Sequence, residues 1–190
     1  MSTPATERLL IGAFAYFLEA GVTVDGCIVA AETVASPLAG KPDAAPTTNW
    51  SNNQLGNVMK AKFSTKTADE TYLVPSQAGG YDEEVEKRVI ADMLDVTSDK
   101  ATEYFHRLAM GLSASIVNGT AQAPSAIRDR KLTGWLRVQA RKQAGTDIFL
   151  LDWWCEMRLK DLPEYSDKVI QPQYEFRKLY SSLNSVNFPA

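Results

Sequence analysis

Apolar and polar residues alternate most regularly in the last third of the chain. Between Phe149 and Leu159 every second residue is apolar, and charged residues such as Asp152 and Glu156 stand between them. This two-residue period predicts a long strand with one buried and one wetted face. Residues 132–141 alternate in the same way, and a glycine lies in the segment that separates the two runs. We therefore expect a long β-hairpin over residues 132–159.

Other segments also have the pattern of buried or half-buried strands. Residues 56–66 alternate between apolar positions and positions that include lysine, and a polar stretch, 67–71, follows them. A further extended run covers residues 168–180. Near the start, Leu9–Leu18 and Cys27–Val34 are short apolar runs, the first of which we interpret as a buried strand or a short helix.

The acidic segment of residues 82–96 allows two interpretations. Its apolar members fall in one register: Val85, Val89, Ala91 and Met93. This register favours a strand. A helix over residues 82–94 is the alternative, because glutamate, lysine and leucine all have good helix propensity.

One amphipathic helix is predicted after this segment. Thr97, Ser98 and Asp99 provide an N-cap and an acidic first turn. Apolar residues then recur at spacings of four, three and four, which places Ala101, Phe105, Leu108 and Leu112 on a single helix face. A single helix between long strands predicts an α+β fold. We expect a mainly antiparallel sheet, curled into a β-sandwich or barrel, with the helix on its flank.

The segment of residues 36–53 contains three prolines and several glycine and asparagine residues, which predicts a long loop. We expect Trp50 to anchor this loop against the parent domain or against a neighbouring molecule. The length of 190 residues favours one domain over residues 1–190, or one domain with extended arms.

Composition narrows the class of protein. An apolar content of 45% and a charged content of 23% are ordinary for a packed, soluble protein. A net charge of −3 argues against a dedicated nucleic-acid binder, although passive contact with DNA stays possible. Leu9–Leu18 is much shorter than the roughly 20 residues that span a bilayer, and its flanks do not fit a signal peptide. We therefore expect no membrane partner.

Catalytic and metal-binding motifs are missing from the sequence, so we expect no enzyme and no cofactor. His106 is the only histidine, and Cys27 and Cys155 are the only cysteines. Cys155 lies on the predicted buried face of a strand, which disfavours a Cys–His catalytic pair. A disulfide between the two cysteines is the weaker alternative, because two cysteines make no disulfide framework. The acidic cluster within residues 82–86 is interpreted as a solvated edge, with a metal site as the weaker alternative.

Positive charge is concentrated in residues 128–142, which include Arg137 and Arg141. These side chains could contact phosphates. We favour the interpretation that they form the wet face of a strand and pair with the acidic strand of residues 83–95, in the same subunit or in an adjacent one. Separate acidic and basic strands suit repeated contacts between subunits.

Several loose motifs follow one another along most of the chain. Leu10–Ala13 is an apolar opener, and a long loop leads to Trp50 and then to Leu55–Val58 ahead of a strand. The single helix, the long hairpin and a closing strand at Ile170–Tyr180 come next. This order of elements resembles that of the major tail proteins, or tail tube proteins, of long-tailed bacteriophages.

The resemblance implies that six copies close into a ring and that rings stack into a tube. The long strands would then join into one lumen-lining barrel, which leaves no free strand edge. On this interpretation the lumen strands are residues 56–66, 82–96, 132–143 and 147–159. The loop of residues 36–53, with Pro42, Pro46 and Trp50, would contact the next ring. Candidate lumen-facing or inter-subunit charges are Lys60, Lys62, Glu84, Glu86, Arg88, Asp92, Arg137 and Arg141.

The first hypothesis is a virion structural protein of the tail, assembled in the host cytoplasm. Its partners would be further copies of itself, other tail proteins and DNA passing without specific binding. A second hypothesis is a monomeric or dimeric β-barrel that binds a small apolar ligand near Trp153, Trp154 and Tyr174. A third is an enzyme that uses the acidic cluster, and a fourth is a related tail component, such as a terminator or a distal ring protein.

Overall fold

The computed structural model describes residues 12–35, 38–42, 53–76, 79–111, 130–141, 147–161 and 170–188. Most of the described part is antiparallel β-structure with a single α-helix, which confirms a β-rich α+β fold. The elements are β1 (Gly12–Glu19), β2 (Thr23–Val24), β3 (Cys27–Val29), β4 (Val34–Ala35), β5 (Leu38–Gly40), β6 (Gln54–Ser76), β7 (Gly80–Ser98), α2 (Glu103–Met110), β8 (Leu132–Arg141), β9 (Asp147–Leu159), β10 (Gln173–Lys178) and β11 (Ser185–Asn187).

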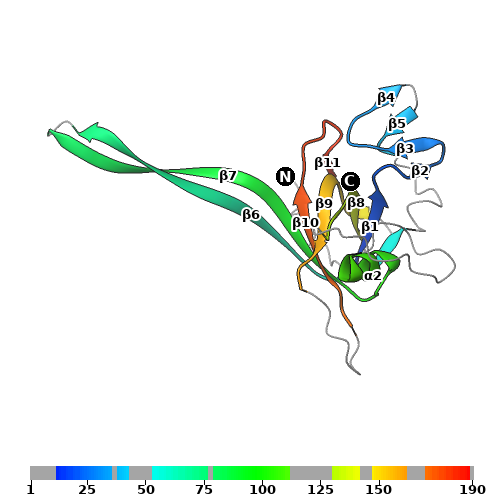
Figure 1. Cartoon of the computed structure of the whole chain (residues 1–190). Coiled ribbons are helices and arrows are strands. Elements are labelled where there is room, and N and C mark those ends of the chain that lie inside the picture. Colours follow the sequence, from blue (N-terminus) through cyan, green and yellow to red (C-terminus); the bar gives the residue numbers. More distant parts are fainter. Residues whose placement is uncertain are drawn as a thin grey trace, which may run out of the picture.

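The strand pairings of the larger sheet close on themselves (Figure 1). The order is β10-β7-β6-β1-β8-β9, and β10 pairs with β9 as well as with β7. Tyr174 of β10 therefore lies opposite Val96 on one side and opposite Leu159 on the other. The short strand β11 adds to another part of β9. This closed set of pairings brings β1 and β10 together, and we call the closed set with the elements packed on it the body.

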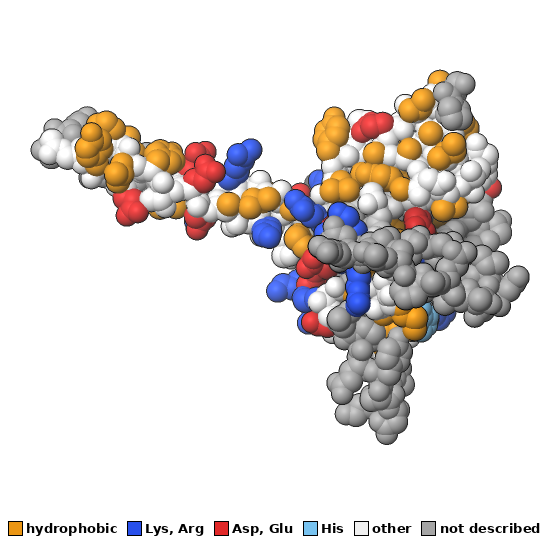
Figure 2. Space-filling view, viewed as in Figure 1, with side chains coloured by type: hydrophobic (Ala, Val, Ile, Leu, Met, Phe, Trp, Pro, Cys, Tyr) orange, Lys and Arg blue, Asp and Glu red, His pale blue; other side chains and the backbone are white. Residues whose placement is uncertain are grey.

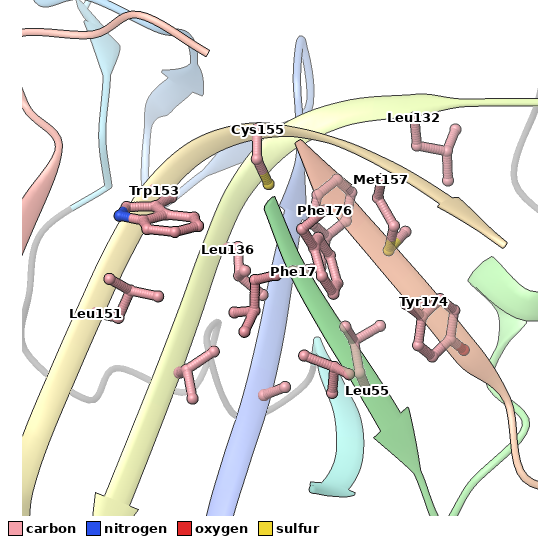
Figure 3. Close-up of a cluster of buried hydrophobic side chains, with 14 of the residues drawn as sticks. Phe17, Leu55, Leu132, Leu136, Leu151, Trp153, Cys155, Met157, Tyr174 and Phe176 are labelled. Carbon is pink, nitrogen blue, oxygen red and sulfur yellow. The ribbon is translucent and has the colours of Figure 1, made fainter. Parts of the chain in front are cut away.

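The main hydrophobic core lies within this closed set of strands (Figure 3). Phe17, Trp153, Tyr174 and Phe176 are among its buried side chains, and they come from β1, β9 and β10. Helix α2 adds Phe105 and a leucine to the same core, so the predicted packing of the helix against the sheet is confirmed. Large aromatic and aliphatic side chains fill the interior of the body.

A second apolar cluster covers the opposite faces of β8 and β9. Trp135 and Trp154 meet there edge to face, with their ring centroids 5.6 Å apart, beneath the small sheet β2-β3-β5-β4. The indole N–H of Trp135 donates to the carbonyl oxygen of Ala30 at 2.8 Å. The expectation that these strands have a wetted face was wrong, because the small sheet and the residues after β10 cover that face.

The helix is shorter than the apolar spacing predicted. Thr102 occupies the N-cap position without a side-chain capping bond, and Gly111 ends the helix in the left-handed conformation. The expected cap residues instead join two strands. Ser98 donates its hydroxyl to a carbonyl of β6 at 2.6 Å, and Asp99 accepts the backbone N–H of Asn57 at 2.7 Å. No helix in the described part is long and apolar enough to cross a membrane.

The hairpin β6–β7 extends far outside the body (Figure 1). Its strands contain 23 and 19 residues, so residues 67–71 continue the strand and the helical alternative for residues 82–94 was wrong. A register shift after Lys66 leaves Ile90 of β7 without a partner on β6. Such a bulge bends and twists a ribbon. We call the part beyond this bulge, residues 67–76 and 79–89, the arm.

Candidate assembly interface

One face of the β6–β7 ribbon carries a row of exposed apolar side chains. The register places Val89 and Val85 opposite threonines, Tyr81 opposite a proline and Glu83 opposite Leu73, and all these side chains share a face. Leu73 is 67% exposed, Tyr81 72%, Val85 53% and Val89 60%. Phe63 continues the row at the root, where its ring meets Trp153 at 5.7 Å. We call these five exposed side chains the stripe: Phe63, Leu73, Tyr81, Val85 and Val89. The exposed pair Asp69–Lys87 lies on the same face and interrupts the stripe between Val85 and Val89.

The outer edges of the arm lack partner strands within the described part of the chain. Strand β6 pairs with β1 only over residues 54–58, and β7 pairs with β10 only over residues 93–97. Beyond these stretches the two strands pair only with each other. Unpaired backbone N–H and C=O groups on long strands favour pairing with another chain. The arm therefore has both an apolar face and two free edges.

The other face of the ribbon carries four of the predicted interface charges, together with Tyr72, which is 44% exposed. Lys60, Lys62, Glu86 and Arg88 lie on this face and are exposed. The lysines lie near the body, while Glu86 lies farther out, opposite Glu70 (Figure 2). Two carboxylates directly opposite each other destabilise a strand pair. A neighbouring molecule that brings positive charge to this position would relieve that repulsion.

The remaining charged candidates do not form one group with these four. Asp92 lies on the stripe face close to the body, and its carboxylate is 3.6 Å from the ammonium nitrogen of Lys178. The side chains of Glu84 and Arg141 lie outside the described part of the structure, although both residues belong to strands.

Arg137 is a correction, because it is buried inside the chain. It is 4% exposed, and its guanidinium donates two hydrogen bonds of 2.8 Å to Asp152, which is 2% exposed. Lys41 adds a third bond to the same carboxylate at 2.9 Å. Burial acts to raise the pKa of the Asp152 carboxyl, but Arg137 and then Lys41 outweigh it and leave this pKa below its usual range. Asp152 of β9 therefore joins Arg137 of β8 to Lys41, the residue after β5, and Arg137 is not an interface charge.

The expected loop of residues 36–53 is only partly described. Residues 38–40 form strand β5 of the small sheet, so this part is not a loop. Pro42 is buried within the chain, which corrects its assignment to a contact with the next ring. Pro46 and Trp50 lie outside the described residues.

The sequence analysis missed the extent of the arm and most of its stripe. It placed Val85 and Val89 in one register with Ala91 and Met93, but the bulge at Ile90 puts the two pairs on opposite faces. The threonines of residues 65–71 were the available signal, because β-branched residues at alternate positions favour a strand even where no apolar residue occurs.

Groups with reactive chemistry lie apart from the arm. Both cysteines are free; Cys27 is half-buried, and Cys155 is fully buried, so that burial raises the pKa of its thiol. His106 is half-buried and its ring packs against Phe105. In the described residues no cluster of three or more histidine, cysteine or carboxylate side chains is placed to hold a metal ion.

Comparison of the chain with protein-family models and with curated proteins gave no match. The case for a function therefore depends on the geometry of the arm and of the surfaces around its root. Exposed apolar side chains, exposed charges and two free edges on one ribbon are together the features of a surface that contacts protein.

Proposed function

We propose that this protein is a virion structural subunit that self-assembles into stacked rings, which form a tail tube for the passage of DNA. The observation that carries the proposal is the arm with its stripe. A two-stranded ribbon has no core of its own and is marginal in water. An apolar stripe on such a ribbon is best explained by burial against another molecule.

The length of the arm fits a contact between neighbouring copies. Ten residues of β6 lie beyond the bulge, and at about 3.4 Å per residue they reach roughly 30 Å. A compact body of about 165 residues has a radius of gyration near 15 Å. An arm of this length therefore spans most of an adjacent body. Contacts of this kind, repeated around a ring, would also explain the unpaired edges.

We infer that the closed set of strands is a small barrel, packed with side chains, so that the bore lies between copies and not within one. Most side chains of residues 132–140 in β8 and of residues 151–157 in β9 are buried on both faces, which argues against these stretches as lumen strands. If only the two arm strands of each copy lined the bore, a six-copy ring would form a barrel of twelve strands. Single-chain barrels that enclose an aqueous channel have about 16–18 strands. We therefore place the arms between copies, with the bodies forming most of the wall.

The ligand-binding alternative has less support. Trp153 and Tyr174 belong to the filled main core, whereas Trp154 belongs to the second cluster on the other face of β9. These three aromatic residues therefore do not line one cavity. A terminator or a distal ring protein would use the same kind of arm contact, and the height of the assemblies would separate these roles from a tube.

The test is the mass of the purified protein against concentration by light scattering, with negative-stain imaging of large species. We expect the 20.9 kDa chain to form rings or hollow tubes as concentration rises. A matched variant replaces residues 67–90 with Asn-Gly, which joins the paired residues Lys66 and Ala91 through a tight turn and keeps the register of the root. This variant should keep the near-ultraviolet spectrum of the body and stay monomeric. A full-length chain that stays monomeric at every concentration, with the arm intact, would refute the proposal.

A further inference from the structure

A groove lies at the elbow where the arm leaves the body. It is formed by Val89–Asp92 of β7 on one side and by the segment that follows β10 on the other, and its volume is about 360 Å³. We call it the elbow groove. Valine, isoleucine, leucine and tyrosine side chains line it, and Lys178 and Asp92 lie among the polar groups of its lining. Tyr180 beside it is 86% exposed. A mixture of apolar side chains, an exposed tyrosine and a few polar groups is the composition of a protein-binding site.

The tip of the arm has the complementary chemistry. Leu73 and Tyr81 lie diagonally across the two strands on the stripe face, close enough to act as one apolar unit. Glu83 lies directly opposite Leu73 and is exposed. The tip therefore presents an aliphatic and an aromatic side chain with a carboxylate beside them, and the groove offers an apolar surface with a lysine beside it.

The tip cannot occupy the groove of its own chain. Val89 lines the groove and Tyr81 lies eight residues away on the same strand, so about 26 Å of paired ribbon separates them. Folding back would break the backbone ladder between β6 and β7. A tip that fills an elbow groove must therefore come from a second copy.

We infer that the arm tip of one copy docks in the elbow groove of the next copy. This inference rests on the proposed function and names the two surfaces that meet in the ring. The tip and the groove are different patches, so each copy gives one contact and receives one, which leads to rings or to open chains. A single contact of this size is a weak interface. In a closed ring each copy is held at two such contacts, so the assembly is more stable than one contact alone.

Cysteine cross-linking between two chains tests the contact directly. In a Cys27→Ser background, a chain with Leu73→Cys is mixed with a mass-tagged chain with Tyr180→Cys, and the mixture is oxidised at concentrations where light scattering shows large species. The matched control mixes Leu73→Cys with Val22→Cys, which is exposed on the body but lies outside the groove. We expect at least tenfold more hetero-linked peptide between positions 73 and 180 than between positions 73 and 22.

Charge reversal gives a second readout that does not need a new thiol. The Asp92 carboxylate lies 3.6 Å from the ammonium nitrogen of Lys178 in the same groove, so this test uses an Asp92→Asn background. In that background Glu83→Lys and Lys178→Glu should each raise the concentration of half-assembly about threefold, as for an exposed ion pair, and the double variant should recover most of the loss. Large species that form with equal cross-linking at positions 180 and 22, or without recovery in the double variant, would overturn the docking site and leave self-assembly standing. No large species at any concentration would overturn both.

Discussion

Removing the apolar tip should weaken assembly without weakening the fold. The variant carries Leu73→Thr and Tyr81→Thr, which keep strand propensity while removing most of the exposed apolar area. Leu73 is 67% and Tyr81 72% exposed in the single chain, so two thirds or more of each side chain is available for burial. Full burial of a large apolar side chain is worth about 1.5–3 kcal/mol, so the pair should contribute about 2–3 kcal/mol to each contact. The concentration of half-assembly should then rise roughly 30- to 150-fold.

The measurement is sedimentation velocity over a concentration series, with thermal unfolding of the dilute monomer as the check on folding. The matched control carries Val34→Thr and Leu38→Thr, which remove similarly exposed side chains from the small sheet. The control should assemble at the wild-type concentration. The reasoning is refuted if the tip variant assembles within twofold of wild type, or if the control loses as much as the tip variant does.

Three further predictions concern the body. Asp152→Asn should lower the unfolding free energy by about 3–5 kcal/mol, because it leaves buried cations without their carboxylate. The folded pKa of Asp152 is depressed, so the stabilisation by this carboxylate in the wild type should be present above about pH 4 and be lost as the pH falls through the folded pKa. Unfolding measured over an acid titration should show this loss. Gly134→Ala should destabilise strongly, because its Cβ would overlap the Leu18 carbonyl, whereas Gly12→Ala has open space and should change the melting temperature little. Cys27 should react with a thiol reagent in the native protein and Cys155 only after unfolding.

Each of these has an outcome that would count against it. Glu156→Gln removes a more exposed carboxylate, held by Lys131 and Arg158, so it should cost less than about 1 kcal/mol; an equal loss would contradict the special role of the buried cluster. Gly134→Ala with a wild-type melting temperature would mean that β1 and β8 lie farther apart. Two fast-reacting thiols in the native state would show that β9 is open to solvent.

The parts of the fold that the sequence predicted are those that depend on short-range pattern. The hairpin of residues 132–159 follows from alternation over ten or more residues. The strand of residues 82–96 was also predicted, although from a register that the bulge at Ile90 interrupts. The single helix was also predictable, although its cap was not, because Ser98 and Asp99 have side chains that suit either a cap or a link between strands.

The features that the sequence did not predict depend on partners distant along the chain. Arg137 has the sequence context of an exposed strand residue, and only the approach of Asp152 and Lys41 makes its burial possible. The bulge at Ile90 changes the face of every later residue of β7 without any glycine or proline to mark it. A one-residue shift of this kind decides which side chains form the stripe, so the candidate site could not be read from a two-residue period.

The late position of β10 in the chain determines the order in which the arm tip and the elbow groove form during synthesis. Hairpin β6–β7 is complete once residue 98 has been made, whereas β10 begins at residue 173. At about 5–20 residues per second, translation needs roughly 4–15 s to cover that interval. During this time the arm tip exists, but the groove does not, because residues 178–181 and 184 line it and are made later. In the docking that we propose, an unfinished chain can offer its tip to a neighbour but cannot receive one, so only a completed body would allow a ring to grow past it.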